Sequence, residues 1–143
     1  MVKEDLYHTA ERHAVLLEMM KDVHAFLEKH EIVYSMGCGS LLGAVRHNGF
    51  IPWDDDIDLI LDRENYERVL QIFGECEGYV LQRTLWIYRI QREEDRGVKN
   101  LTVPTIDLFV LDALPTSSLK RRYQLLRLRM MQGMMKGDRK SVV

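Results

Sequence analysis

Hydrophobic residues recur every three or four positions over residues 4–30, and this spacing predicts a long amphipathic helix. Asp62 suits the N-cap of a further helix, and a glycine turn at 37–40 separates a strand from a short helix. The remaining patterns predict helices over 41–47, 63–73 and 119–136, and strands over 32–36, 57–62, 79–82, 85–91 and 105–112. Helices that alternate with strands in this order predict an α/β or α+β domain, a mixed β-sheet flanked by helices.

The last helical pattern is both basic and apolar, so we divide the chain into a core over residues 1–118 and a C-terminal helical segment over 119–143. Its apolar side needs a surface to cover, and we expect that surface to be the protein's own core. Docking on a partner, including self-association through this helix, is the alternative. The side chains concerned are Leu125, Leu126, Leu128, Met130, Met131, Met134 and Met135.

Composition narrows the class of protein. The 143 residues are 46% hydrophobic and carry a net charge of −2, which fits one modest globular core and excludes a strongly basic nucleic-acid binder. The segment from Leu119 onward holds eight lysines and arginines against one acid, so the rest of the chain is acidic. A basic face of this kind is usually solvated, although it can also meet phosphates or anionic lipid. We expect no nucleic-acid partner.

Two cysteines, Cys38 and Cys76, stand in unlike contexts without metal-ligand spacing. They indicate free thiols and a reducing compartment rather than a disulfide scaffold. No apolar run approaches the roughly 20 residues of a membrane span, and the charged N-terminus does not resemble a secretory signal. These features predict a cytoplasmic protein with no transmembrane segment.

Four aspartates crowd into five positions in IPWDDDIDLIL, residues 51–61, and run directly into a hydrophobic strand. Alternate strand residues share a face, so Asp56 and Asp58 point to the same side and make a seat for a hard cation such as Mg²⁺. A solvated acidic loop explains Asp54 and Asp55 but not Asp58. An EF-hand loop beginning at Asp54 lacks the required glycine and glutamate.

Asp107 interrupts a second hydrophobic strand, TIDLFVLD. If this strand lies beside residues 57–61, three carboxylates converge, and a pair of metal ions could clamp the oxygens of a phosphoryl transfer. Upstream, Gly39 and Ser40 form a turn where backbone N–H groups can approach phosphate oxygens.

Residues 12–75 closely resemble the LicD family of phosphocholine transferases, within the nucleotidyltransferase superfamily. The match lies in GSLLGAVRHNGFIPWDDDIDLIL and the helix before it, and it continues to IDLFVLDALP at 106–115. Fukutin-type ribitol-phosphate transferases are similar but more distant. The resemblance implies a nucleotidyltransferase-type mixed β-sheet.

The resemblance also implies roles for individual residues. Mg²⁺ or Mn²⁺ would bind three carboxylates. One of these, Asp107, is either a ligand only or the base that takes the acceptor's proton. The donor's phosphates would be held by a second group of residues. Trp53 either packs under the loop, which we expect, or stacks on a base. The implied metal-binding and catalytic residues are Asp56, Asp58 and Asp107, and the implied phosphate-binding residues are Gly39, Ser40, Arg46, His47 and Arg89.

The function that the resemblance implies is transfer of a phosphocholine-like group. A CDP-linked donor would supply it to a hydroxyl of a cell-surface glycan, such as a teichoic acid or lipopolysaccharide precursor. Two alternatives remain open: nucleotidyl transfer to a small molecule or protein, and an inactive nucleotide-binding module. YRIQRE around Arg89 matches the family's basic strand loosely, and family members run past residue 143, so we expect the chain to be truncated relative to them.

Overall fold

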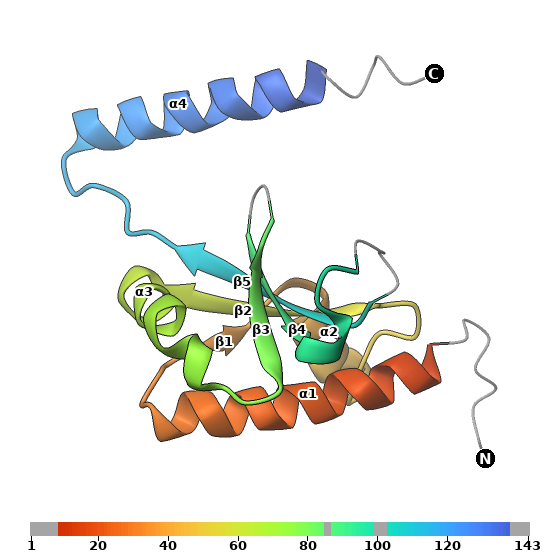
Figure 1. Cartoon of the computed structure of the whole chain (residues 1–143). Helices are drawn as coiled ribbons and strands as arrows, with labels where there is room; N and C mark the ends of the chain where they lie inside the picture. The colour runs from red at the N-terminus through yellow and green to blue at the C-terminus, as the bar shows by residue number, and fades with distance from the viewer. Residues whose placement is uncertain (1–8, 85–86, 99–102, 138–143) are drawn as a thin grey trace. The chain divides into compact units, whose positions relative to one another are not determined.

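The computed structural model describes residues 9–84, 87–98 and 103–137, with side chains as far as Met130. The predicted α/β class, a mixed sheet flanked by helices, is confirmed (Figure 1). The chain divides into two compact units, Met1–Leu111 and Asp112–Val143. The elements are α1 (Ala10–Lys29), β1 (Ser35–Met36), α2 (Cys38–His47), β2 (Asp56–Asp62), α3 (Arg63–Ile72), the 3₁₀ turns η1 (Phe73–Glu75) and η2 (Glu93–Asp95), β3 (Tyr79–Arg83), β4 (Tyr88–Arg92), β5 (Thr105–Leu111) and α4 (Ser118–Gly137).

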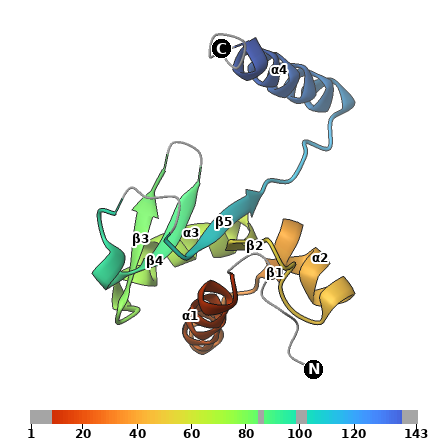
Figure 2. The same cartoon turned by 90° about the vertical axis from the view of Figure 1, so that its right-hand side faces the viewer.

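The first unit is built on a sheet whose strand order among the described residues is β1-β2-β5-β4-β3. β2 and β5 are parallel, and the other neighbouring pairs are antiparallel. Figure 2 shows α2 beside β1, at the edge of the sheet opposite β3. Because β2 and β5 are the central parallel pair, they place residues 56–62 and 105–111 side by side.

The two faces of the central strands differ in chemistry. Ile57, Leu59 and Leu61 alternate with the aspartates of β2, and they are at most 1% exposed. Ile106 and Leu108 of β5 stand in register with them and belong to the same buried cluster. Asp56, Asp58 and Asp107 have the opposite parity, so the core lies on one face of these strands and the carboxylates lie on the other.

α1 covers the apolar face along its buried stripe, which consists of Leu16, Met19, Val23 and Leu27. This spacing of three or four residues confirms the predicted helix. Residues 4–8 of that prediction lie outside the described residues, and the observed helix begins at Ala10. α3 and η1 add Tyr66, Val69 and Phe73 to the same core, and Asp62 caps α3 by accepting a hydrogen bond from the Asn65 backbone.

The segment before α2 differs from the prediction in two ways. The strand expected over 32–36 is limited to Ser35–Met36, because the N–H groups of Ile32 and Val33 bond to Leu27 O and to the Asn65 side chain instead. The turn expected at 37–40 is also wrong: α2 starts at Cys38, and the Gly37 carbonyl accepts the Leu41 N–H at 2.9 Å. Gly39 and Ser40 therefore lie in the first turn of a helix.

Gly43 lets α2 touch the loop that follows it. A Cβ added at this position would lie 2.6 Å from Gly49 O and 2.9 Å from Ile51 N, and both are backbone atoms that cannot rotate away. We expect Gly43→Ala to lower the free energy of unfolding by about 1–3 kcal/mol, as overpacking does. Urea denaturation measures this loss. Gly74→Ala is the control, because a Cβ there meets nothing within 4 Å. Equal midpoints for the two variants would contradict the close approach.

The second unit contains α4 as its helix. Taken by itself, the unit offers no other described element against which the apolar side chains of α4 could pack. Within this unit Leu125, Leu126, Leu128 and Met130 are between 42% and 62% exposed, and the expectation that they cover the protein's own core stays a prediction. The side chains of Met131, Met134 and Met135 lie outside the described residues. No helix in the described ranges combines the length and apolar character that crossing a bilayer requires.

Candidate active site

Three carboxylates converge on the polar face where β2 and β5 run side by side. Asp58 stands opposite Asp107 in the ladder, and Asp56 lies two residues earlier on β2. One oxygen from each of the three lies within 4.8 Å of the others. Asp58 is 8% exposed and Asp107 is 3% exposed. The condition that the two aspartate strands are neighbours is met, and their pairing creates the cluster.

Burial raises the pKa of each carboxyl in this cluster. Burial is the largest cause of the rise for Asp56, whose pKa reaches about 6, and the neighbouring Asp58 and Asp107 raise it further. Burial is also the largest cause of the raised pKa of Asp58, and the charge of Asp107 raises it further. Hydrogen bonds from Gly39 and Cys38 lower this pKa in part. Carboxylates placed this way repel one another unless a cation or a proton compensates them.

The donor set fits a hard divalent cation. All three side chains offer carboxylate oxygens, which are the ligands that Mg²⁺ and Mn²⁺ favour. Asp107 Oδ1 is buried and receives no well-directed hydrogen bond, although buried polar atoms are normally satisfied. Arg89 Nε lies 2.9 Å from this oxygen, and a buried carboxylate oxygen within a group of carboxylates suits a cation site.

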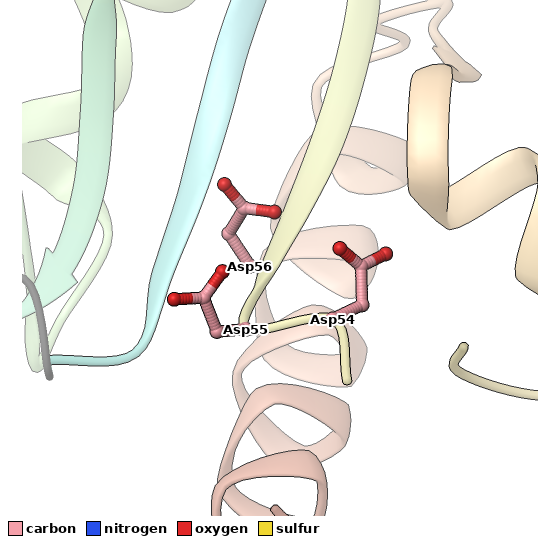
Figure 3. Close-up of side chains that lie close together, drawn as sticks. All are labelled: Asp54, Asp55 and Asp56. Carbon is pink, nitrogen blue, oxygen red and sulfur yellow. The ribbon is translucent and has the colours of Figure 1, made fainter. Parts of the chain in front are cut away.

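A second acidic group lies at the entrance to β2. Asp54, Asp55 and Asp56 also bring oxygens within 4.8 Å of one another. Figure 3 shows the carboxylates of Asp55 and Asp56 turned to the side of β5, whereas that of Asp54 turns to the other side of the strand. Asp55 is exposed and Asp54 is half-buried, so the solvated-loop interpretation holds for Asp55 only.

The first turn of α2 fixes Asp58 from the other side. Ser40 Oγ accepts the Asp58 backbone N–H at 2.8 Å, and Gly37 N donates to Asp58 O at 2.9 Å. The Gly39 backbone N–H bonds to the Asp58 side chain, and a Cβ on Gly39 would collide with the Asp54 carboxylate. The sequence predicts that Gly39 and Ser40 hold donor phosphates. That role stays a prediction, whereas their contacts with Asp58 are direct.

Ser40 satisfies a buried backbone group, so its loss has a defined cost. We expect Ser40→Ala to lower the free energy of unfolding by about 1–3 kcal/mol, because the Asp58 N–H is left without an acceptor. Ser40→Thr keeps the hydroxyl oxygen and should recover part of the loss. Ser35→Ala is the control, since Ser35 is exposed and only donates to the next residue's carbonyl. Chemical denaturation measures all three, and an unchanged midpoint for Ser40→Ala would contradict the assignment.

Arg89 lies beside Asp107 on the neighbouring strand. The two residues are cross-strand partners in the β4–β5 ladder. Arg89 Nη2 donates to Asp107 Oδ2 at 3.0 Å, and Arg89 Nε lies 2.9 Å from Asp107 Oδ1. Burial raises the pKa of Asp107, and the Arg89 guanidinium opposes that rise. The strand around Arg89 matches the family pattern only loosely in sequence, yet the structure brings this residue to the carboxylate cluster.

Comparison of the chain with known proteins identifies the family to which it belongs. Residues 31–117 match the model described as LicD/FKTN/FKRP, nucleotidyltransferase domain. That match covers more than half of the chain and every carboxylate of the cluster. The chain belongs to the LicD family.

Several curated proteins are similar to this LicD-family chain. The lipopolysaccharide cholinephosphotransferase LicD of Haemophilus influenzae is 33% identical over 73% of this chain and 44% of its own length. An uncharacterized protein of Rickettsia typhi is 36% identical over 64% of this chain and 34% of its own length. The human ribitol 5-phosphate transferase FKRP is 35% identical over 56% of this chain and 16% of its own length. The chain therefore spans less than half the length of each of these relatives.

Two residues of the LicD motif lie away from the carboxylates. Arg46 and His47 are exposed and occupy the last turn of α2, whereas the first turn meets Asp58. At 1.5 Å per residue, Arg46 lies about 12 Å along the helix axis from Cys38. The structure does not bring these two side chains to the cluster, and their predicted contact with donor phosphate stays a prediction.

Two other residues near the cluster differ from the sequence interpretation. Trp53 was expected to pack under the loop, but it is 62% exposed, so that expectation is wrong. The sequence assigns Cys38 no role, yet its thiol bonds to the Asp58 side chain from a backbone with φ of 44°. Positive φ in a residue other than glycine marks strain and often accompanies functional sites. No periodicity or spacing marks a single cysteine of this kind in the sequence.

Proposed function

We propose that this LicD-family chain carries the donor-binding part of a metal-dependent transferase. The transferase would move a phosphocholine-like group from a CDP-linked donor to a hydroxyl of a cell-surface glycan, such as a lipopolysaccharide or teichoic acid precursor. The observation that carries the proposal is the convergence of Asp56, Asp58 and Asp107 on one face of the β2–β5 pair. The activities for which the cholinephosphotransferase and ribitol 5-phosphate transferase relatives are named support transfer of a substituted phosphate.

In this proposal the chain contributes position and charge. Asp56, Asp58 and Asp107 would hold Mg²⁺ or Mn²⁺, which when bound supplies positive charge that stabilises phosphoryl transfer. Ser40 holds the backbone of Asp58 by accepting its N–H, and the Gly39 backbone N–H holds the Asp58 carboxylate. Arg89 orients Asp107, and its side chain is 33% exposed, so its guanidinium can also meet a donor phosphate.

The proposed transfer breaks the phosphoanhydride bond of the CDP-linked donor and forms a phosphodiester bond to the acceptor. The acceptor hydroxyl oxygen attacks the phosphorus that carries the choline-like group, the bond to the CMP oxygen breaks, and the acceptor's proton leaves to a base. Asp107 is a candidate for that base. Its close pairing with Arg89 favours the role of ligand, because a guanidinium stabilises the unprotonated carboxylate.

Calorimetric titration with CDP-choline, with and without Mg²⁺, tests the proposal. We expect binding that depends on Mg²⁺ and that is lost in Asp58→Asn. CTP and ATP serve as competing ligands, because preference for a triphosphate would favour nucleotidyl transfer instead. Binding of Mg²⁺ without turnover of any donor, in a longer version of the protein as well, would favour an inactive nucleotide-binding module. Cytoplasmic location and self-association through α4 stay predictions.

A further inference from the structure

The start of α1 contacts the loop that leads into the carboxylate cluster. We call residues 50–55 the aspartate loop. Thr9 Oγ1 donates to the Pro52 carbonyl at 2.5 Å, and Arg12 Nη1 lies 3.4 Å from Asp55 Oδ2. These contacts join parts of the chain that are more than 40 positions apart in sequence. The contacting residues of α1 lie outside the 31–117 family match, so the family model does not describe them.

His13 contacts the aspartate loop in two ways, through its Nε2 and through the face of its ring. Its Nε2 lies 2.7 Å from the Asp54 carbonyl oxygen. Since a carbonyl only accepts hydrogen bonds, Nε2 carries the proton and donates it. The ring also stacks on Phe50, with centroids 4.5 Å apart and planes 9° apart. His13 therefore holds the aspartate loop both at Phe50 and at the peptide two residues before Asp56.

Asp56 depends on this loop more than its two partners do. Asp107 lies within β5 and is paired with Arg89, and Asp58 lies within β2 and is held by the first turn of α2. Asp56 is the first residue of β2, where the loop ends and the ladder begins. A shift of the loop backbone at Asp54 would move the Asp56 carboxylate relative to the other two. The geometry of the three oxygens thus depends on what fixes the loop.

We propose that His13 is a positioning residue for the divalent cation site, acting through the Asp54 carbonyl and the Phe50 ring. This inference rests on the cation binding of the proposed function and adds α1 to that site. Partners that orient metal ligands from outside the ligand set commonly change metal affinity by about 10–100-fold when they are lost. His13 acts one peptide further away, so its effect should lie near the lower end of that range.

Mn²⁺ titration of the full chain tests the proposal, with no donor or acceptor present. His13→Phe keeps a ring against Phe50 but donates no hydrogen bond, and we expect it to weaken Mn²⁺ binding about 10-fold. His13→Gln places an amide donor near the Nε2 position, so it should recover most of that loss. Thermal unfolding of the same samples without metal shows that each variant is folded at the temperature of the titration.

His24→Phe is the matched control on the same helix. His24 also lies on α1 and also makes a side-chain hydrogen bond, with the Tyr34 hydroxyl at 3.0 Å, but it does not contact the aspartate loop. We expect this control to bind Mn²⁺ as the unmodified chain does. Mn²⁺ affinity that is unchanged in His13→Phe, even with a lower melting temperature, would reduce His13 to a packing role and overturn the inference.

Two further outcomes separate the inference from the proposed function. Loss of affinity in His13→Gln equal to that in His13→Phe would show that the hydrogen bond to Asp54 does not carry the effect, which overturns positioning through the Asp54 carbonyl. Absence of Mn²⁺ binding by the unmodified, folded chain would overturn the cation site itself and the role of His13 with it. Weaker binding in His13→Phe alone, with recovery in His13→Gln, supports the proposal.

Discussion

Asp56→Asn is expected to stabilise the cation-free protein while it abolishes cation-dependent donor binding. The pKa of Asp56 is raised from 3.8 to about 6 by burial and by its carboxylate neighbours, so its charge opposes folding at neutral pH. A shift of this size corresponds to about 3 kcal/mol, which we reduce to about 1–2 kcal/mol because the residue is only half-buried. Asparagine is neutral, so it removes this destabilisation. It also removes a negatively charged ligand oxygen from the cation site.

The same shift fixes the pH dependence of stability. The folded-state pKa of Asp56 lies above the unfolded value of 3.8, so the folded protein binds more protons between 3.8 and about 6. Stability from this group is therefore greatest at low pH and is lost as pH rises through that window. We expect the difference in unfolding free energy between Asp56→Asn and the unmodified chain to grow from about pH 4 to about pH 7 in the absence of divalent cations.

Thermal unfolding with and without Mg²⁺ measures both effects of Asp56→Asn. The unmodified chain should melt at a lower temperature than the variant without Mg²⁺ and should gain stability as Mg²⁺ is added, because the ligand binds the folded state. The variant should gain little. Glu77→Gln, which changes an exposed acid outside the cluster, is the control and should alter neither result. A destabilised Asp56→Asn protein would contradict the electrostatic account of the cluster.

The sequence predicted the central strands and their carboxylates because each leaves a local signal. An aspartate that interrupts a hydrophobic run in β2 or β5 is visible without any knowledge of neighbours. The position of β5 beside β2 was only a condition in that prediction, since strand order depends on contacts between distant segments. The structure meets the condition, and the register of Asp58 with Asp107 is a detail that no local pattern contains.

Other parts of the site could not be predicted, for related reasons. Gly39 and Ser40 suggested a turn, but the Gly37 carbonyl starts a helix, and the first turn of α2 then bonds to Asp58. Arg46 belongs to the same motif as the carboxylates, yet a rigid helix places it at the opposite end. His13 contacts the aspartate loop through one ring, and a contact between two distant polar groups leaves no periodic trace in either segment.

Removal of the Arg89 side chain is expected to have the largest effect on stability. Asp107 is 3% exposed, and Arg89 is the cation that faces both of its oxygens. Breaking a buried ion pair by deleting one partner typically costs 3–5 kcal/mol, because the other charge stays buried without compensation. Arg89 is itself 33% exposed, so water can replace part of the lost interaction, and we expect Arg89→Met to cost about 2–3 kcal/mol.

Arg92→Met provides a control on the same strand. Its side chain is 34% exposed, almost the same as that of Arg89, but its partners Glu94 and Asp95 are 67% and 20% exposed. Ion pairs of this more exposed kind contribute about 0–1 kcal/mol, so the two variants differ mainly in the burial of the remaining carboxylate. Urea denaturation of both, in the absence of divalent cations, isolates the contribution of the charge left on Asp107.

Mg²⁺ should then compensate for the missing guanidinium. A cation held by the cluster would neutralise the Asp107 charge that Arg89→Met leaves unpaired, so Mg²⁺ should raise the unfolding free energy of this variant more than that of the unmodified chain. Arg92→Met should show no such excess. If Arg89→Met loses no more stability than Arg92→Met, the Arg89–Asp107 pair is not a buried pair in solution. If it loses stability but gains nothing extra from Mg²⁺, Asp107 is not a ligand of the cation, and its role reduces to pairing with Arg89.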